Sequence, residues 1–314
     1  MAHIIATLFP VFAVLALGYA LASKAFLSRT FLNELNRFVY YVALPALMIH
    51  SVAGAEHLPP QILPALSVYI LATMATMGLA LLNAQLLGLQ RWQVGTFVQA
   101  AFRGNIAFIG LPILLYALRN EPPERASGIV AQGVFIFAPM MIFYNVFSVI
   151  FLVGSQDSNP WKNLPKTFRN ILTNPLVIAA LIGILLFLMP VDLPEPVMNT
   201  LEFIGRTAAP CALICVGGGM AVVSMQGRYR SATFSSILKT TAIPLLVYLI
   251  SRPFDLSPAT TLILMIYAAT PTAVASYVMA KEMKGDEAMA SGGIVISTVL
   301  SVISLGVIVG LFGF

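Results

Sequence analysis

Residues 101–112 read Ala-Phe-Arg-Gly-Asn-Ile-Ala-Phe-Ile-Gly-Leu-Pro, and they lie in the middle of a long apolar segment. Pro112 cannot donate a hydrogen bond to the carbonyl of Phe108, and its ring disfavours helix in the residue before it. Gly104 and Gly110 lower the cost of unwinding the chain. Non-helical backbone at membrane depth is tolerated only where protein encloses it or where it lines a wet cavity. The stretch therefore predicts a broken membrane helix.

The composition around this stretch is that of a membrane protein. Hydrophobic residues make up 59% of the 314 residues and charged residues only 9%, against about 25% charged residues in soluble domains. The first apolar block is interpreted as a retained span, because no Lys or Arg precedes it as in a signal peptide. We predict an all-α polytopic protein with ten spans near 4–22, 36–54, 63–87, 93–118, 128–153, 171–189, 199–225, 235–251, 258–280 and 288–312.

Basic residues divide unevenly between the two sides of this bundle. One side carries twelve of them: Lys24, Arg29, Arg37, Arg91, Lys162, Lys166, Arg169, Arg228, Arg230, Lys239, Lys281 and Lys284. The other side carries three: Arg119, Arg125 and Arg252. Positive loops stay cytoplasmic, so both termini are expected on the outer face of a cell (inner or plasma) membrane. The net charge of +5 is then explained by membrane topology and by contact with lipid headgroups, and it does not indicate binding of nucleic acid.

Prolines and glycines recur along the chain at a fixed spacing. Three pairs share an offset of 165 residues (175 minus 10, 183 minus 18, 210 minus 45): Pro10 with Pro175, Gly18 with Gly183, and Pro45 with Pro210. Two copies of an odd number of spans must enter the membrane in opposite directions. We therefore predict two inverted five-helix repeats, 1–154 and 171–314, joined by a cytoplasmic loop over 155–170.

The second repeat offers a counterpart to the first broken helix, Thr270-Pro271-Thr272, where Pro271 is expected to leave the carbonyl of Tyr267 unpaired. If both helices break and cross, two helix N-termini with partial positive charge point at the centre. Arg103 adds a full charge and serves either as a substrate contact or as a counter-charge or gate. Proline kinks that only shape packing are the alternative interpretation. Two kinks at equivalent positions favour a site for an anion such as a carboxylate.

The remaining candidates are weaker. Asn105 and Thr270 lie beside the two breaks, whereas Gln132 and Asn145 are candidates for a polar lining. His50 either carries a proton or is a hydrogen-bonded helix histidine. Arg206 follows Glu202 by four residues and is expected to form a structural ion pair. The run Gly217-Gly218-Gly219 is expected to allow close helix packing.

These motifs resemble the auxin efflux carrier family in its short prokaryotic form, over essentially the full length of the chain. The matching stretches are 105–112, 270–277, and 284–288 leading into 297–301. The resemblance implies a fold like that of the bile-acid symporters and sodium/proton antiporters, with crossing broken helices and elevator-type alternating access. It also implies small carboxylate substrates and a substrate contact at Asn105. Threonines flank Pro271 where plant carriers have an asparagine, so an auxin-like binding mode is not expected.

The sequence as a whole therefore predicts a secondary transporter for a small organic anion. The alternatives are a cation- or proton-coupled carrier of the same fold and a membrane receptor that does not transport. An enzyme is not expected, because none of the three histidines sits in a hydrolase motif. No cofactor or metal is expected; membrane lipids are the other partner, and a homodimer is left open.

Overall fold

The computed structural model describes residues 2–55, 59, 61–156, 169, 172–189, 193–221 and 228–312. Its α-helices are α1 (Ala2–Ser23), α2 (Arg29–Phe38), α3 (Leu44–Ala53), α4 (Ile62–Leu86), α5 (Arg91–Phe102), α6 (Leu111–Ala117), α7 (Pro123–Gly154), α9 (Pro175–Leu188), α10 (Glu195–Gly205), α11 (Ala208–Ala221), α12 (Tyr229–Ile237), α13 (Ile243–Ser251), α14 (Pro258–Ala269), α15 (Ala275–Glu282) and α16 (Glu287–Phe312). In this part of the chain all regular elements are helical, and one isolated bridge joins Gly104 to Thr272.

In the part of the chain that the structure describes, five helical stretches are long and apolar enough to cross a membrane: Ile62–Leu86, Pro123–Gly154, Glu195–Ala221, Tyr229–Phe254 and Glu287–Phe312. Shorter apolar helices accompany them at Leu8–Ser23, Ile106–Ala117, Pro175–Leu188 and Pro258–Ala269. The prediction of an all-helical membrane protein is confirmed. The ten-span count and the inverted repeats stay predictions, and most of the predicted loop over 155–170 lies outside the described residues.

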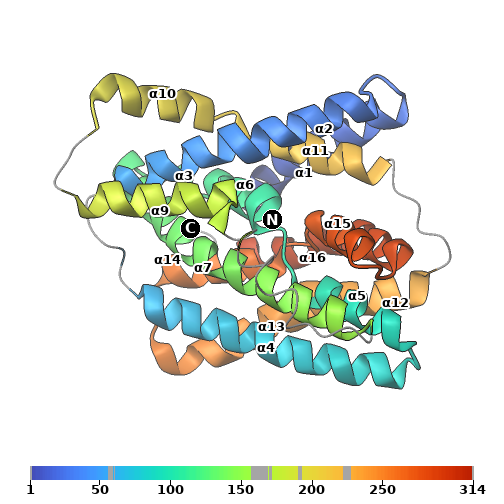
Figure 1. Cartoon of the computed structure of the whole chain (residues 1–314). Helices are drawn as coiled ribbons and strands as arrows, with labels where there is room; N and C mark the ends of the chain where they lie inside the picture. Colours follow the sequence, from blue (N-terminus) through green and yellow to red (C-terminus); the bar gives the residue numbers. More distant parts are fainter. Residues whose placement is uncertain are drawn as a thin grey trace.

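The helices pack as two groups. In the first group, α1 packs along α11, α2 against α11, and α3 against α9 and α10. The second group contains α4 to α7 and α12 to α16, with α16 packed on α12 and α14, and α5 packed on α4 and α7. In Figure 1, α2, α10 and α11 lie in the upper half of the view, whereas α4, α5 and α13 lie in the lower half. The groups meet where α1 contacts α16 and where α7 contacts α3 and α9.

Among the described residues, three helices contain a single π turn: η1 (Val39–Ala43), η2 (Ile106–Gly110) and η4 (Leu238–Ala242). In each, the residue after the turn donates its N–H to the carbonyl five residues back. That residue is followed every time by a proline, namely Pro45, Pro112 or Pro244. A proline ring clashes with the carbonyl four residues before it. We infer that widening the preceding turn relieves this clash, and π turns of this kind are frequent at functional sites.

Small residues allow α1 and α11 to approach closely, as the glycine run predicts. A Cβ at Gly217 would overlap the carbonyl oxygen of Leu15, and one at Gly18 would lie 2.5 Å from the carbonyl oxygen of Ile214. Close approach over small residues is a main source of helix association in membranes. At Gly219 no atom lies within 4 Å of the Cβ position, so glycine is needed only where α11 contacts α1.

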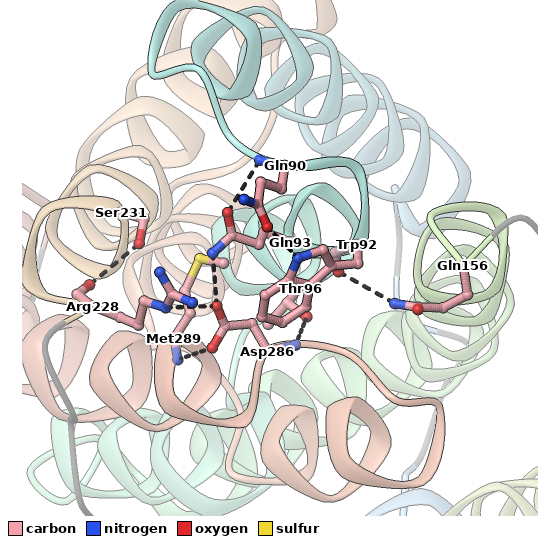
Figure 2. Close-up of polar contacts among 9 residues, drawn as sticks. All are labelled: Gln90, Trp92, Gln93, Thr96, Gln156, Arg228, Ser231, Asp286 and Met289. Atoms are coloured by element: carbon pink, nitrogen blue, oxygen red, sulfur yellow. Dashed lines mark hydrogen bonds and ion pairs between the residues drawn. The ribbon is translucent and has the colours of Figure 1, made fainter.

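Asp286 ties three helix ends of the second group together (Figure 2). Its carboxylate accepts hydrogen bonds from Nε2 of Gln93 at 2.9 Å and from the N–H of Met289 at 3.0 Å. It also pairs with Nε of Arg228 at 2.9 Å, and its own N–H donates to Oγ1 of Thr96 at 2.9 Å. The start of α5, the start of α16 and the residue before α12 are therefore held at one point, which we call the Asp286 clasp.

Candidate functional site

The two proline segments cross as antiparallel extended backbone. Helix α5 ends at Phe102, and the N–H of Asn105 donates to the carbonyl of Pro271 at 2.8 Å. The N–H of Ala273 donates to the carbonyl of Arg103 at 2.9 Å. The backbone that both breaks would leave exposed is thus largely paired across the crossing, which is what a non-helical segment inside a bilayer requires.

The predicted threonines donate hydrogen bonds to carbonyls at the carboxyl ends of the interrupted helices. Oγ1 of Thr272 donates to the carbonyl of Ala100 near the end of α5 at 2.8 Å. Oγ1 of Thr270 donates to the carbonyl of Tyr267 near the end of α14 at 2.6 Å. The expectation that the carbonyl of Tyr267 is unpaired was therefore wrong, because the hydroxyl of Thr270 donates to it. Both threonines are fully buried, and neither hydroxyl reaches the cavity described below.

The glycines of the first motif permit the crossing itself. A Cβ at Gly104 would lie 2.6 Å from Oγ1 of Thr270, and one at Gly110 would lie 2.9 Å from Cγ2 of the same residue. Both distances are shorter than real Cβ contacts. Gly104 also lines the cavity, whereas Gly110 and Pro112 lie behind it. Their role is to bring the two segments together.

A cavity of about 450 Å³ lies between the two helix groups at this crossing. Its second-group wall consists of residues 103–108, residues 273–275, Val278, Met279, Glu282 and Met283, together with Met141, Asn145 and Val149 of α7. Its first-group wall consists of Asn36, Tyr40, Asn174, Leu176, Cys215 and Val216. The cavity volume lies within the range of small-molecule sites.

Arg103 supplies the positive charge of this cavity and is 4% exposed. Its guanidinium donates to Oγ of Ser148 at 3.0 Å and to Oδ1 of Asn145 at 2.8 Å, with a longer bond to the carbonyl of Tyr144. All three partners are neutral groups on α7. The structure thus brings the predicted Arg103 and Asn145 together, and it fixes the arginine without neutralising its charge.

Asn105 holds an unused donor in the wall of the same space. The residue is 5% exposed and lines the cavity, and its Nδ2 atom, which is itself buried, has no hydrogen-bond partner among the residues that the structure describes. Buried polar atoms are nearly always hydrogen-bonded, so an orphaned donor needs an explanation. Next to it, the chain restarts as helix at Ile106, and α15 restarts at Ala275. The first N–H groups of a helix lack partners within it and carry partial positive charge.

Two predicted residues lie away from this cavity. Gln132 of α7 donates from Nε2 to Oγ1 of Thr260 at 2.9 Å. His50 of α3 does not line the cavity. The expected pair of Arg206 with Glu202 is confirmed, with Nη2 2.6 Å from Oε1 on an exposed surface.

The sequence did not mark Lys239 as a site residue; it was counted only among the basic residues of the predicted cytoplasmic side. In the structure, Lys239 lies in η4, is fully buried and donates from Nζ to the carbonyl of Ala268 at 2.6 Å. Sequence reasoning also missed Asn36, Tyr40 and Asn174 in the cavity wall. A signal was present for two of them, since Tyr40 and Lys239 each stand five residues before a proline, inside a π turn.

The amino-acid sequence matches proteins described as membrane transporters. The family model described as "Membrane transport protein" matches residues 3–309. A protein of Rhizobium meliloti (strain 1021) described as "Putative malonate transporter" is 27% identical over 308 residues, covering 96% of this chain and 93% of the relative. A protein of Methanothermobacter thermautotrophicus described as "Uncharacterized transporter" is 26% identical over 301 residues, covering 95% of each.

Proposed function

The chain belongs to the membrane transport protein family, that of the auxin efflux carriers, and from this premise we propose that it carries a small organic anion through the cavity at the crossing. Membership makes the chain an integral membrane transporter. The anion class is inferred from Arg103 and the unpartnered amide of Asn105 in the cavity wall; Glu282, the other charged lining residue, is exposed.

The observation that carries this proposal is the unpartnered Nδ2 of Asn105, buried in the cavity wall near Arg103. Because Nδ2 is itself buried, the side chain would have to turn toward the cavity, where a carboxylate oxygen would accept from this amide. It would also face the N-terminus of the helix that starts at Ile106. Helix α15 starts just after the other crossing segment and offers a second helix N-terminus.

Two helix ends and one arginine suit a substrate with two carboxylates. A short dicarboxylate is small for a cavity of about 450 Å³, which leaves room for water around it. The relative from Rhizobium meliloti is described as a malonate transporter, and malonate is such a molecule. We therefore take malonate and its close homologues as the first substrates to test.

For the mechanism we propose elevator-type alternating access in a fold of two inverted repeats. The cavity lies between two helix groups, and the crossing belongs entirely to one of them. Glu282 and Met283 in the cavity wall are flanked by Lys281 and Lys284 of the predicted cytoplasmic side. We accordingly assign the structure to an inward-facing state, from which the second group would carry the crossing across the bilayer.

The test is malonate counterflow in proteoliposomes, with Asn105→Ala as the variant. The backbone bond from Asn105 to Pro271 does not need the side chain, so the fold should persist. A hydrogen bond to a charged group contributes about 1.5–3 kcal/mol, which corresponds to a loss of affinity of about 10- to 100-fold. The control is Asn83→Ala on α4, whose partly exposed side chain donates to the carbonyl of Leu79 in its own helix. Wild-type counterflow by Asn105→Ala would refute the assignment.

Cys215 provides a second readout that needs no transport. It lines the cavity wall opposite the crossing, and Cys211 is the other cysteine of the chain. In a Cys211→Ser background, malonate should slow the labelling of Cys215 by a small maleimide, whereas a neutral diol of similar size should not. Equal labelling rates with and without malonate would argue against binding in this cavity.

A further inference from the structure

Lys239 is enclosed at the crossing without contributing to the cavity. It is fully buried in η4, and it is absent from the cavity lining. Burying a charged side chain at membrane depth is costly, and such residues are rare outside functional positions. The proposed substrate site does not use Lys239, so its presence calls for a separate reason.

The position of the ammonium supplies that reason. Nζ donates to the carbonyl of Ala268 at 2.6 Å, one residue before the end of α14. A Cβ built on Gly104 would lie 3.3 Å from Nζ, so the ammonium also lies beside the segment that follows α5. The carboxyl ends of both interrupted helices thus converge on one lysine. Those ends carry the partial negative charge of the helix dipole.

The 2.6 Å contact is a hydrogen bond, and a carbonyl at the carboxyl end of a helix is a favourable acceptor for a charged donor. No acidic side chain is paired with Lys239 in the described part of the chain. The negative potential that holds the ammonium must therefore come from the helix ends.

Carriers with broken helices commonly use half-helix carboxyl ends and unwound carbonyls to hold a coupling cation. Here the side chain of Lys239 already fills that role. We propose that the Lys239 ammonium is a resident cation that neutralises the two helix carboxyl ends in place of sodium, so that this carrier works without a sodium ion. The sodium independence of transport rests on the proposed function, whereas the role of the ammonium in holding the crossing does not.

The experiment measures the melting temperature of purified protein without substrate, and so stands apart from the transport assays. Wild-type protein should melt at the same temperature in sodium chloride and in choline chloride of equal ionic strength. Lys239→Ala should melt lower by about 5 °C or more. n-Propylammonium or sodium should recover at least half of that loss, because either can place a cation in the vacated space.

Two comparisons separate charge from packing. n-Propanol has nearly the shape of n-propylammonium but no charge, and it should recover little of the loss. Lys24→Ala removes an exposed lysine at the end of α1 and should leave the melting temperature within about 1 °C of wild type.

Three results would overturn the proposal: sodium-dependent stabilisation of the wild type, recovery of Lys239→Ala by n-propanol as complete as by n-propylammonium, or an unchanged melting temperature in Lys239→Ala. If Lys239→Ala does not fold, the wild-type comparison of sodium with choline still decides between a resident and a bound cation. Malonate counterflow by the wild type in sodium-free buffer should equal that in sodium buffer.

Discussion

Replacing Asp286 by asparagine tests whether the Asp286 clasp holds the second helix group together. The substitution keeps the shape of the side chain and removes its charge. The carbonyl oxygen of the amide can still accept from the N–H of Met289. The amide nitrogen, however, takes the place of the oxygen that accepts from Gln93 and Arg228, so donor would face donor.

The expected cost follows from these two contacts. Loss of the buried bond from Gln93 to a charged acceptor costs about 1.5–3 kcal/mol. The amide of Gln93 cannot simply rotate, because its oxygen already accepts from the N–H of Gln90 at 3.1 Å. Arg228 is 41% exposed and can turn to water, so its ion pair adds less than about 1 kcal/mol. Asp286→Asn should lower the free energy of unfolding by about 2–4 kcal/mol.

The assay is unfolding by sodium dodecyl sulfate in mixed micelles, followed by tryptophan fluorescence. The matched control is Glu287→Gln, the exposed neighbour whose Oε2 accepts from the hydroxyl of Tyr277 at 3.2 Å, with an expected change below about 0.5 kcal/mol. Malonate affinity of folded Asp286→Asn should stay unchanged, because Asp286 does not line the cavity. A loss of stability no larger than that of the control would refute the reasoning about the Asp286 clasp.

Two further substitutions test helix packing and a buried hydrogen bond. Gly217→Ala places a methyl group on the carbonyl of Leu15 and should lower the free energy of unfolding by about 3 kcal/mol in the same assay. Gly219→Ala has open space and should be neutral or stabilising by up to about 1 kcal/mol. Equal effects of the two substitutions would contradict the α1–α11 contact. Tyr144→Phe removes the 3.0 Å bond from its hydroxyl to that of Tyr69 and should lower the free energy of unfolding by about 1 kcal/mol, so that an unchanged value would show that this bond contributes nothing.

The candidate site was predictable from sequence where backbone chemistry determines it. Proline and glycine impose local restrictions that hold in any surroundings, so residues 103–105 and 271–273 could be expected to be non-helical. The pairing of Arg103 with Asn145 could not be derived in this way, because it depends on how α7 packs against the crossing. Thr270 and Thr272 show the same limit, since their hydroxyls were equally able to face a substrate or a carbonyl.

The sequence by itself determined the membrane environment, the helical class and the family of this protein, together with the two places where helices break. Composition and local stereochemistry suffice for these features. The tertiary structure alone decided that Lys239 lies inside the bundle, that Asn105 keeps a free donor in a cavity, and that Asp286 joins three helix ends. Each of these depends on partners far away in the sequence, and the energy of a buried polar group is set by those partners.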